Sequence, residues 1–175
     1  SWHAERKTIV GREEITFVNR TSRPFPDVFL HLYLNGFRNT SSTLRRGLPP
    51  PGGSGDYGYC ELTRVALAGG EDLTARVDLS PPGNGNPDDR TLARVSLPRP
   101  VAPGETLVLA VDFESRLPRG LLRTGWKDDF VLAGQWFPKL AKATEAGWRG
   151  RPFHASTEFF ADFGDYDVTL LLPAE

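Results

Sequence analysis

The sequence predicts an all-β fold, an antiparallel β-sandwich that forms a single domain over residues 1–175. Three observations lead to this prediction. Apolar and polar residues alternate with a period of two in several segments, turn formers are frequent (18 Gly and 15 Pro), and no segment of ten or more residues keeps the apolar spacing of a helix. A chain of this length buries about 70% of its unfolded surface, so we expect a core that needs neither disulfides nor metal.

The first two expected strands lie near the N-terminus. Residues 15–18 (Ile-Thr-Phe-Val) indicate a strand that ends in a polar turn at residues 19–22. Residues 28–34 (Val-Phe-Leu-His-Leu-Tyr-Leu) are apolar on both faces, which predicts a strand buried on both sides or covered on its outer face by another domain. We expect His31, within this run, to be half-buried and hydrogen-bonded.

The middle of the chain continues with shorter elements. Gly69-Gly70 interrupts the apolar run of residues 65–73, which favours a hairpin turn there over a helix. Residues 77–79 and 92–97 show short alternating patterns typical of strands. Two segments rich in Gly and Pro, residues 45–59 and 81–89, are expected to be surface loops.

The last part of the chain is expected to contain two longer strands. Pro103-Gly104 suits the central positions of a type II turn, where glycine supplies the positive φ, and an alternating strand pattern follows at residues 107–113. Residues 165–172 (Asp-Tyr-Asp-Val-Thr-Leu-Leu-Leu) alternate again and predict a closing strand.

About half of the aromatic residues lie between residues 126 and 163. Aromatic side chains at this density fill a core or an interdomain seam, or they form a platform on which sugars stack. We favour packing, because the aromatics do not alternate as one exposed strip. They are Trp126, Phe130, Trp136, Phe137, Trp148, Phe153, Phe159, Phe160 and Phe163.

Composition and motifs exclude several functions for this chain. Lys plus Arg total 21 against 22 Asp plus Glu, so the basic excess that nucleic-acid binding needs is missing. Its three histidines lack the spacing of a zinc peptidase motif, and there is no nucleophile elbow or phosphate loop. Cys60 is the single cysteine and is expected to be a small core residue; no apolar run is long enough for a membrane segment. We expect no catalytic residue and no metal ligand in this chain.

Four segments resemble a known family. They are residues 14–19 (Glu-Ile-Thr-Phe-Val-Asn), 28–35 (Val-Phe-Leu-His-Leu-Tyr-Leu-Asn), 134–141 (Gly-Gln-Trp-Phe-Pro-Lys-Leu-Ala) and 163–170 (Phe-Gly-Asp-Tyr-Asp-Val-Thr-Leu). Together they are similar to the saddle-like N-terminal β-sandwich domain of aminopeptidase N-type (gluzincin) zinc metallopeptidases, in particular a bacterial branch. The resemblance covers residues 11–173.

The resemblance implies a non-catalytic role. In this family the sandwich packs on a catalytic domain of the same chain, which binds the zinc ion, and the sandwich helps to wall the cleft that receives the free amino end of a peptide substrate. A Gln or Glu of the domain lies near that amine. Gln135 is the nearest candidate here, although it lies closer to the proline than in the family, and Trp136 and Phe137 would line the cleft or the domain seam. The zinc-binding domain would follow residue 175, in a bacterial protein whose compartment the sequence leaves open.

Two other interpretations remain open. One is a free-standing module that binds carbohydrate or protein, with Trp126, Trp136 or Trp148 as the contact residues. The other is a structural or scaffold protein whose ancestor was a peptidase. The absence of catalytic motifs from this chain is compatible with these two interpretations and with the accessory domain that the resemblance implies.

Overall fold

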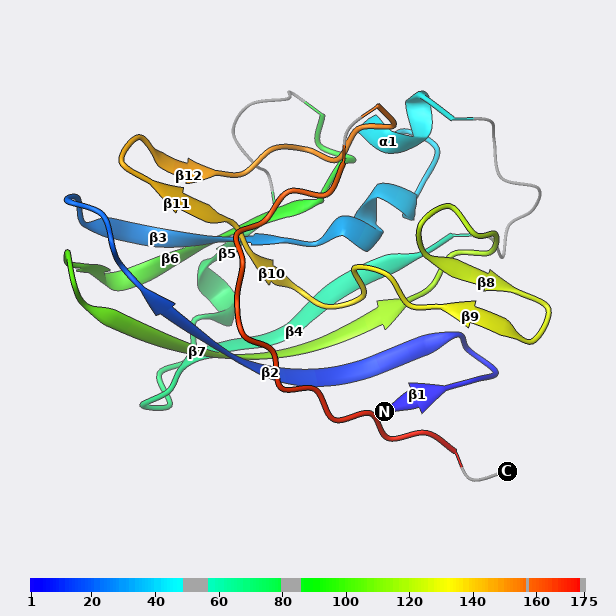
Figure 1. Ribbon diagram of the computed structural model, residues 1–175, viewed down its shortest axis with the longest axis horizontal. Coiled ribbons are helices and arrows are strands. Elements are labelled where there is room, and N and C mark those ends of the chain that lie inside the picture. Colours follow the sequence, from blue (N-terminus) through cyan, green and yellow to red (C-terminus); the bar gives the residue numbers. More distant parts are fainter. Residues whose placement is uncertain (49–56, 80–85, 157, 174–175) are drawn as a thin grey trace.

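The computed structural model describes residues 1–48, 57–79, 86–156 and 158–173 (Figure 1). Two four-stranded sheets dominate it. In spatial order, sheet A contains β1 (Trp2–His3), β2 (Thr8–Val18), β7 (Thr106–Arg116) and β4 (Tyr59–Leu67). Sheet B contains β10 (Lys139–Leu140), β3 (Phe25–His31), β6 (Leu92–Val101) and β5 (Val77–Asp78).

Smaller elements connect and cover the sheets. Among the described residues, two hairpins lie outside the four-stranded sheets. One pairs β8 (Gly125–Lys127) with β9 (Phe130–Leu132), and the other pairs β11 (Lys142–Thr144) with β12 (Gly147–Arg149). The helices are short: η1 (Tyr33–Phe37), α1 (Thr43–Arg46) and η2 (Thr74–Arg76). None of the helices in the described ranges has the length and apolar character needed to cross a membrane.

The prediction of an all-β fold is confirmed. Every strand pair in the part of the chain that the structure describes is antiparallel. The inner faces of the two sheets meet in one hydrophobic core, to which sheet A contributes Val65 and Val111 and sheet B contributes Val28 and Val95, all fully buried. The specific saddle-like shape of the aminopeptidase N domain stays a prediction.

This chain itself covers both sides of strand β3, the inner side fully and the outer side in part. Its inner face carries Val28 and Leu30, which belong to the core. On the outer side the ring of Phe29 lies 6.4 Å from the ring of Trp148 in β12, and the Trp148 indole N–H donates a hydrogen bond of 3.0 Å to the Asp27 carbonyl. The sequence analysis left open whether another domain covers this outer side. The β11–β12 hairpin of the same chain packs there (Figure 1).

The predicted strand over residues 28–34 is wrong at its C-terminal end, because β3 stops at His31 and the chain enters the 3-10 helix η1. The reason is Asn35. Its amide group donates to the carbonyls of Cys60 (2.9 Å) and Arg90 (2.8 Å), and its side-chain oxygen accepts from the Cys60 N–H (2.9 Å). The chain must turn away from the sheet to place this side chain between two other segments.

Both predicted glycine turns are confirmed. Gly104 has φ of 78°, and the Glu105 N–H donates to the Ala102 carbonyl at 3.0 Å, as a type II turn requires. Gly70 has φ of 94° at the end of β4, where its N–H donates to the Leu67 carbonyl at 2.9 Å. Glycine adopts these conformations without the steric cost that a Cβ atom brings.

The predicted closing strand over residues 165–172 is wrong. This segment is extended but belongs to no sheet, and one backbone hydrogen bond ties it to β1, from the Trp2 N–H to the Leu171 carbonyl at 3.1 Å. In Figure 1 it runs as the red chain toward the N-terminus. Alternation specifies two faces, but a strand also needs a neighbouring backbone with which to pair along its length, and the short β1 supplies a single hydrogen bond among the described residues.

The expectation of a surface loop over residues 81–89 is also wrong at its described end. Asp89 is fully buried, and its carboxylate accepts hydrogen bonds from the N–H (3.0 Å) and hydroxyl (2.8 Å) of Thr43 at the start of α1. Asn86 donates to the Ser41 carbonyl at 2.8 Å. These polar groups are buried because they fasten α1 to the body of the protein. Residues 49–56 and 80–85 of the two predicted loops lie outside the described residues.

Candidate functional site

The three residues for which the resemblance implies a substrate-binding role lie between β9 and β10. Gln135 has φ of 53°, a left-handed conformation that is uncommon for residues other than glycine. Its side-chain oxygen is buried, and no hydrogen-bond partner for it is found among the described residues. A Cβ atom on the preceding Gly134 would overlap with the Arg123 carbonyl, so this stretch is packed closely on residue 123.

Trp136 and Phe137 extend from the core toward the surface. The Trp136 ring lies 5.9 Å from Phe113 in the core and 5.1 Å from Phe137, in tilted and edge-on arrangements. Phe137 in turn lies 5.8 Å from Tyr166, in an edge-on arrangement, and the Lys139 ammonium group lies within 6 Å of both of these rings. The structure therefore brings Phe137 into contact with the exposed C-terminal segment, and Trp136 supports Phe137 from the core side.

That segment exposes a series of large apolar side chains, which we call the apolar strip. Its members are each at least half exposed, although apolar residues of this size are usually buried. They are Phe160 (51%), Phe163 (103%), Tyr166 (59%), Val168 (54%), Leu170 (60%), Leu171 (66%) and Leu172 (68%). Contiguous exposed apolar surface is typical of an interaction site. The alternating pattern of residues 165–172 was the sequence signal for it.

The other aromatics of residues 126–163 mainly pack on the core, as predicted. Phe153 is 4% exposed, and Trp126, Trp136, Trp148 and Phe159 pack against buried core residues. Phe130, in β9, is 60% exposed. Each of the tryptophans that was considered for sugar binding is partly buried and packs against the core.

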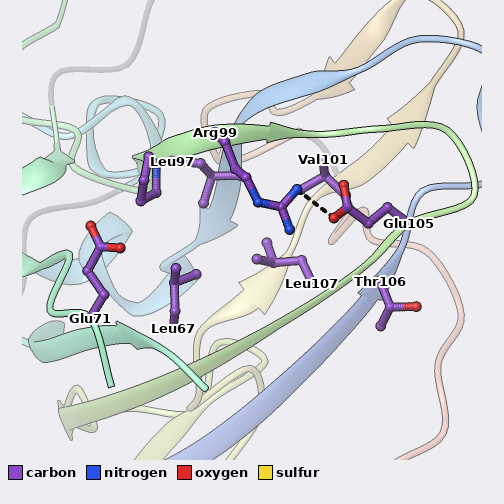
Figure 2. A pocket seen from close by; sticks show the side chains of 9 residues that line it. Leu67, Glu71, Leu97, Arg99, Val101, Glu105, Thr106 and Leu107 are labelled. Carbon is purple, nitrogen blue, oxygen red and sulfur yellow. Dashed lines mark ion pairs between the residues drawn. The ribbon is translucent and has the colours of Figure 1, made fainter. Parts of the chain in front are cut away.

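A small hollow opens between the two sheets at one end of the molecule (Figure 2). It has a volume of about 160 Å³ and an apolar lining from β4, β6 and β7, formed by Leu67, Leu97, Val101 and Leu107. At its rim an Arg99 guanidinium nitrogen lies 2.5 Å from a Glu105 carboxylate oxygen, and Glu71 lies on the opposite side. Sequence reasoning missed this hollow, because its residues are ordinary strand and turn residues from separate segments.

Burial strongly shifts the pKa of the titratable side chains of Cys60, His31 and Glu13. Cys60 is 2% exposed, as predicted, and burial raises the pKa of its thiol to about 12, which disfavours the reactive thiolate. Burial, and secondarily the nearby Lys139 charge, lowers the pKa of His31 to about 4. Burial raises the pKa of Glu13 to about 8. Sequence reasoning missed Glu13, although it shares the inward-facing side of β2 with Ile15 and Phe17.

The expectation for His31 was wrong in two respects. The ring is fully buried rather than half-buried, and neither ring nitrogen has a hydrogen-bond partner among the described residues. It stacks on Tyr33 with ring centroids 4.8 Å apart and an interplanar angle of 9°. This environment favours the neutral imidazole, which stacks as an aromatic ring.

Zinc ions in proteins are bound by His, Cys, Asp or Glu side chains that lie close together. Within the described ranges, no three His, Cys, Asp or Glu side chains lie together in a group that could hold a metal. The zinc ion of the parent protein stays a prediction of the family resemblance.

Comparison with known proteins found no relatives. No family model matches the chain, and neither a curated protein nor a solved structure matches it. The resemblance to the aminopeptidase N-type N-terminal domain therefore rests on the four quoted segments alone.

Proposed function

We propose that this chain is the non-catalytic accessory domain of an aminopeptidase N-type zinc peptidase, and that it packs on the catalytic domain through the apolar strip. The observation that carries the proposal is the exposure of seven large apolar side chains within residues 160–172. Leaving such side chains in water is costly, because each apolar side chain of this size gains roughly 1.5–3 kcal/mol on full burial. A covering domain would remove this cost.

The position of Trp136 and Phe137 supports a docking role for this side of the molecule. These aromatics connect the core residue Phe113 to Tyr166 of the apolar strip through successive ring contacts of 5.9, 5.1 and 5.8 Å. A domain that covers Tyr166 would therefore rest on a rigid aromatic support. We place both residues at the domain seam, with Gln135 as the adjacent polar residue.

The alternative, a carbohydrate-binding module, receives less support. Sugar platforms need a well-exposed aromatic face, whereas Trp126, Trp136 and Trp148 are each partly buried against the core. Lys7 and Arg119 also lie over the Trp126 ring, at 4.9 and 5.6 Å from its centroid. A protein partner fits the apolar strip better than a hydrated sugar does.

The decisive experiment measures binding between this chain and the zinc-binding domain encoded after it in the same gene, each purified separately. We expect saturable binding by calorimetry, and we expect Val168→Asp to weaken it at least tenfold by placing a charge in the apolar seam. Thr169→Asp, on the neighbouring residue of the alternating segment, is the matched control and should change the affinity less than about threefold.

Three results would refute the proposal. The gene could continue without a His-Glu-x-x-His zinc motif, the two domains could fail to bind, or Val168→Asp and Thr169→Asp could have the same effect. Aminoacyl-anilide hydrolysis by this chain alone, with stoichiometric zinc, would also contradict the non-catalytic assignment.

A further inference from the structure

Glu13 occupies an unusual position for a carboxylic acid. In β2 the side chains of Ile9, Gly11, Glu13, Ile15 and Phe17 share one face, because strand side chains alternate, and Ile9 and Phe17 are buried in the core. In the sheet register Glu13 lies opposite Val111, and Val111 lies opposite Val65; both valines are fully buried. The carboxyl group thus belongs to an apolar row of the inner face.

The Glu13 side chain is partly exposed, and one of its two carboxyl oxygens is enclosed by the protein. This Oε1 atom is buried and has no hydrogen-bond partner in the described part of the chain. Burial is the one cause that raises its pKa to about 8, with no cation lowering it. In an ionised carboxylate the buried Oε1 would lack a hydrogen bond and no cation would offset the charge, which is costly where burial removes water.

The neighbouring strands of sheet A present no charge to Glu13. From β7 the inner face presents Val111 and Phe113, and the charged Asp112 and Glu114 alternate to the other face. From β4 the one titratable side chain on the inner face is Cys60, whose pKa Glu13 raises further.

The inner face of sheet B, which lies across the core from sheet A, also presents no charged side chain. Its inner face presents the fully buried, apolar Val28, Leu30, Ala93 and Val95. His31 and Arg94 alternate to the outer face of this sheet.

Strand β2 has a free edge beside Glu13. β1 pairs with β2 at Thr8 and Ile9, and Ser1 exchanges hydrogen bonds with Val10. From residue 11 to residue 18, β2 pairs with β7 on one side, and no described strand pairs with it on the other. The backbone of β2 beside Glu13 is therefore held by strand pairing on one side only.

We propose that Glu13 is a proton-dependent latch for the free edge of β2: the protonated side chain lets residues 11–17 close on the core, and the ionised side chain is released to water by local opening of that edge. The direction of the pH dependence follows from proton linkage. The closed state keeps the proton up to about pH 8, whereas an opened Glu13 loses it near its ordinary value of 4.5. Closure is therefore most favourable below pH 4.5 and is lost as the pH rises through 8.

The test is amide hydrogen exchange of residues 11–17, corrected for intrinsic rates, between about pH 5 and 9. The opening equilibrium should rise up to about tenfold per pH unit between about pH 5 and 8 and then level off. Glu13→Gln keeps the shape of the side chain without an ionisable group and should abolish this rise. Glu14→Gln is the matched control, because Glu14 lies on the exposed face of the same strand and the variant should retain the rise.

The proposal is overturned if Glu13→Gln and the unmodified protein show the same pH dependence, or if Glu14→Gln removes it. A second measurement covers the case in which Glu13→Gln does not fold. The ¹³C resonance of the Glu13 carboxyl group in the unmodified protein should titrate near pH 8, and a midpoint near 4.5 would refute the latch.

Discussion

The hydroxyl group of Tyr33 makes two hydrogen bonds to the backbone of Phe160, donating to its carbonyl at 2.7 Å and accepting from its N–H at 2.9 Å. The Tyr33 ring also contacts Phe153 and Phe159, at centroid distances of 5.4 and 4.9 Å. One side chain in η1 thus fastens the beginning of the apolar strip to the body of the protein.

Removing that hydroxyl group should loosen the segment. Tyr33→Phe leaves the Phe160 backbone without both partners, and we expect the free energy of unfolding to fall by about 1–2 kcal/mol. Limited proteolysis should cut faster between residues 158 and 163. Tyr166→Phe, at a side chain that is 59% exposed, is the control and should stay within about 0.5 kcal/mol of the unmodified protein in urea unfolding. Equal effects of the two variants would contradict this role of Tyr33.

Asn35 should be among the most sensitive polar positions. It is 1% exposed and makes three hydrogen bonds to the backbone of Cys60 and Arg90. Asn35→Ala leaves two carbonyls and one N–H unpaired, so we expect a loss of about 2–4 kcal/mol in urea unfolding. Asn39→Ala removes an exposed hydrogen bond to the Asp88 carbonyl and a partly buried one from the Ser41 N–H, and it should cost less than Asn35→Ala. A smaller loss for Asn35→Ala than for Asn39→Ala would show that η1 does not depend on Asn35.

His31 should make the protein sensitive to acid. Its pKa is lowered from 6.5 to about 4 in the folded state, so the unfolded chain binds the proton first as the pH falls. The stability is therefore complete above pH 6.5 and is lost toward pH 4, by about 3 kcal/mol at most from this group.

The variant His31→Phe should remove this contribution, because a phenyl ring can stack on Tyr33 without taking up a proton. The measurement is the free energy of unfolding at about pH 7, 5.5 and 4, which brackets the shifted pKa. His154→Gln, at an exposed position, is the matched control. If His31→Phe loses as much stability on acidification as the unmodified protein does, another group causes the loss.

Gly11 should not tolerate a side chain. A Cβ atom there would overlap with Cζ of Phe113, the residue opposite it in the register of β2 and β7. We expect Gly11→Ala to destabilise the protein by about 1–3 kcal/mol through overpacking. Gly69→Ala is the control, because a Cβ atom at that glycine meets nothing within 4 Å.

A second substitution separates this clash from a general weakness of β2. Phe113→Leu removes the ring atoms that the added Cβ atom of Gly11→Ala would meet. The double variant should therefore be more stable than the sum of the two single effects implies, with a coupling of about 0.5–3 kcal/mol. Strict additivity in urea unfolding would refute the steric explanation.

Local pattern was sufficient for most strands of the two sheets. The alternation at residues 107–113 predicted β7, and Pro103-Gly104 predicted the turn before it, because both depend on the neighbours of each residue along the chain. The burial of Cys60 followed from its residue type and its place in a strand. Gln135, Trp136 and Phe137 were singled out by resemblance, and their substrate role stays a prediction.

By itself, the sequence determined which segments alternate and therefore which side chains share a face. The tertiary structure decided what each face meets. It left residues 165–172 without a pairing strand and placed Trp148 on the outer side of β3. It also turned the Glu13 side chain toward the inner face of the sheet, whereas Glu14 beside it faces water. The physical reason is that alternation is a property of one backbone, whereas pairing, burial and the cost of a charge depend on groups that are distant in the sequence.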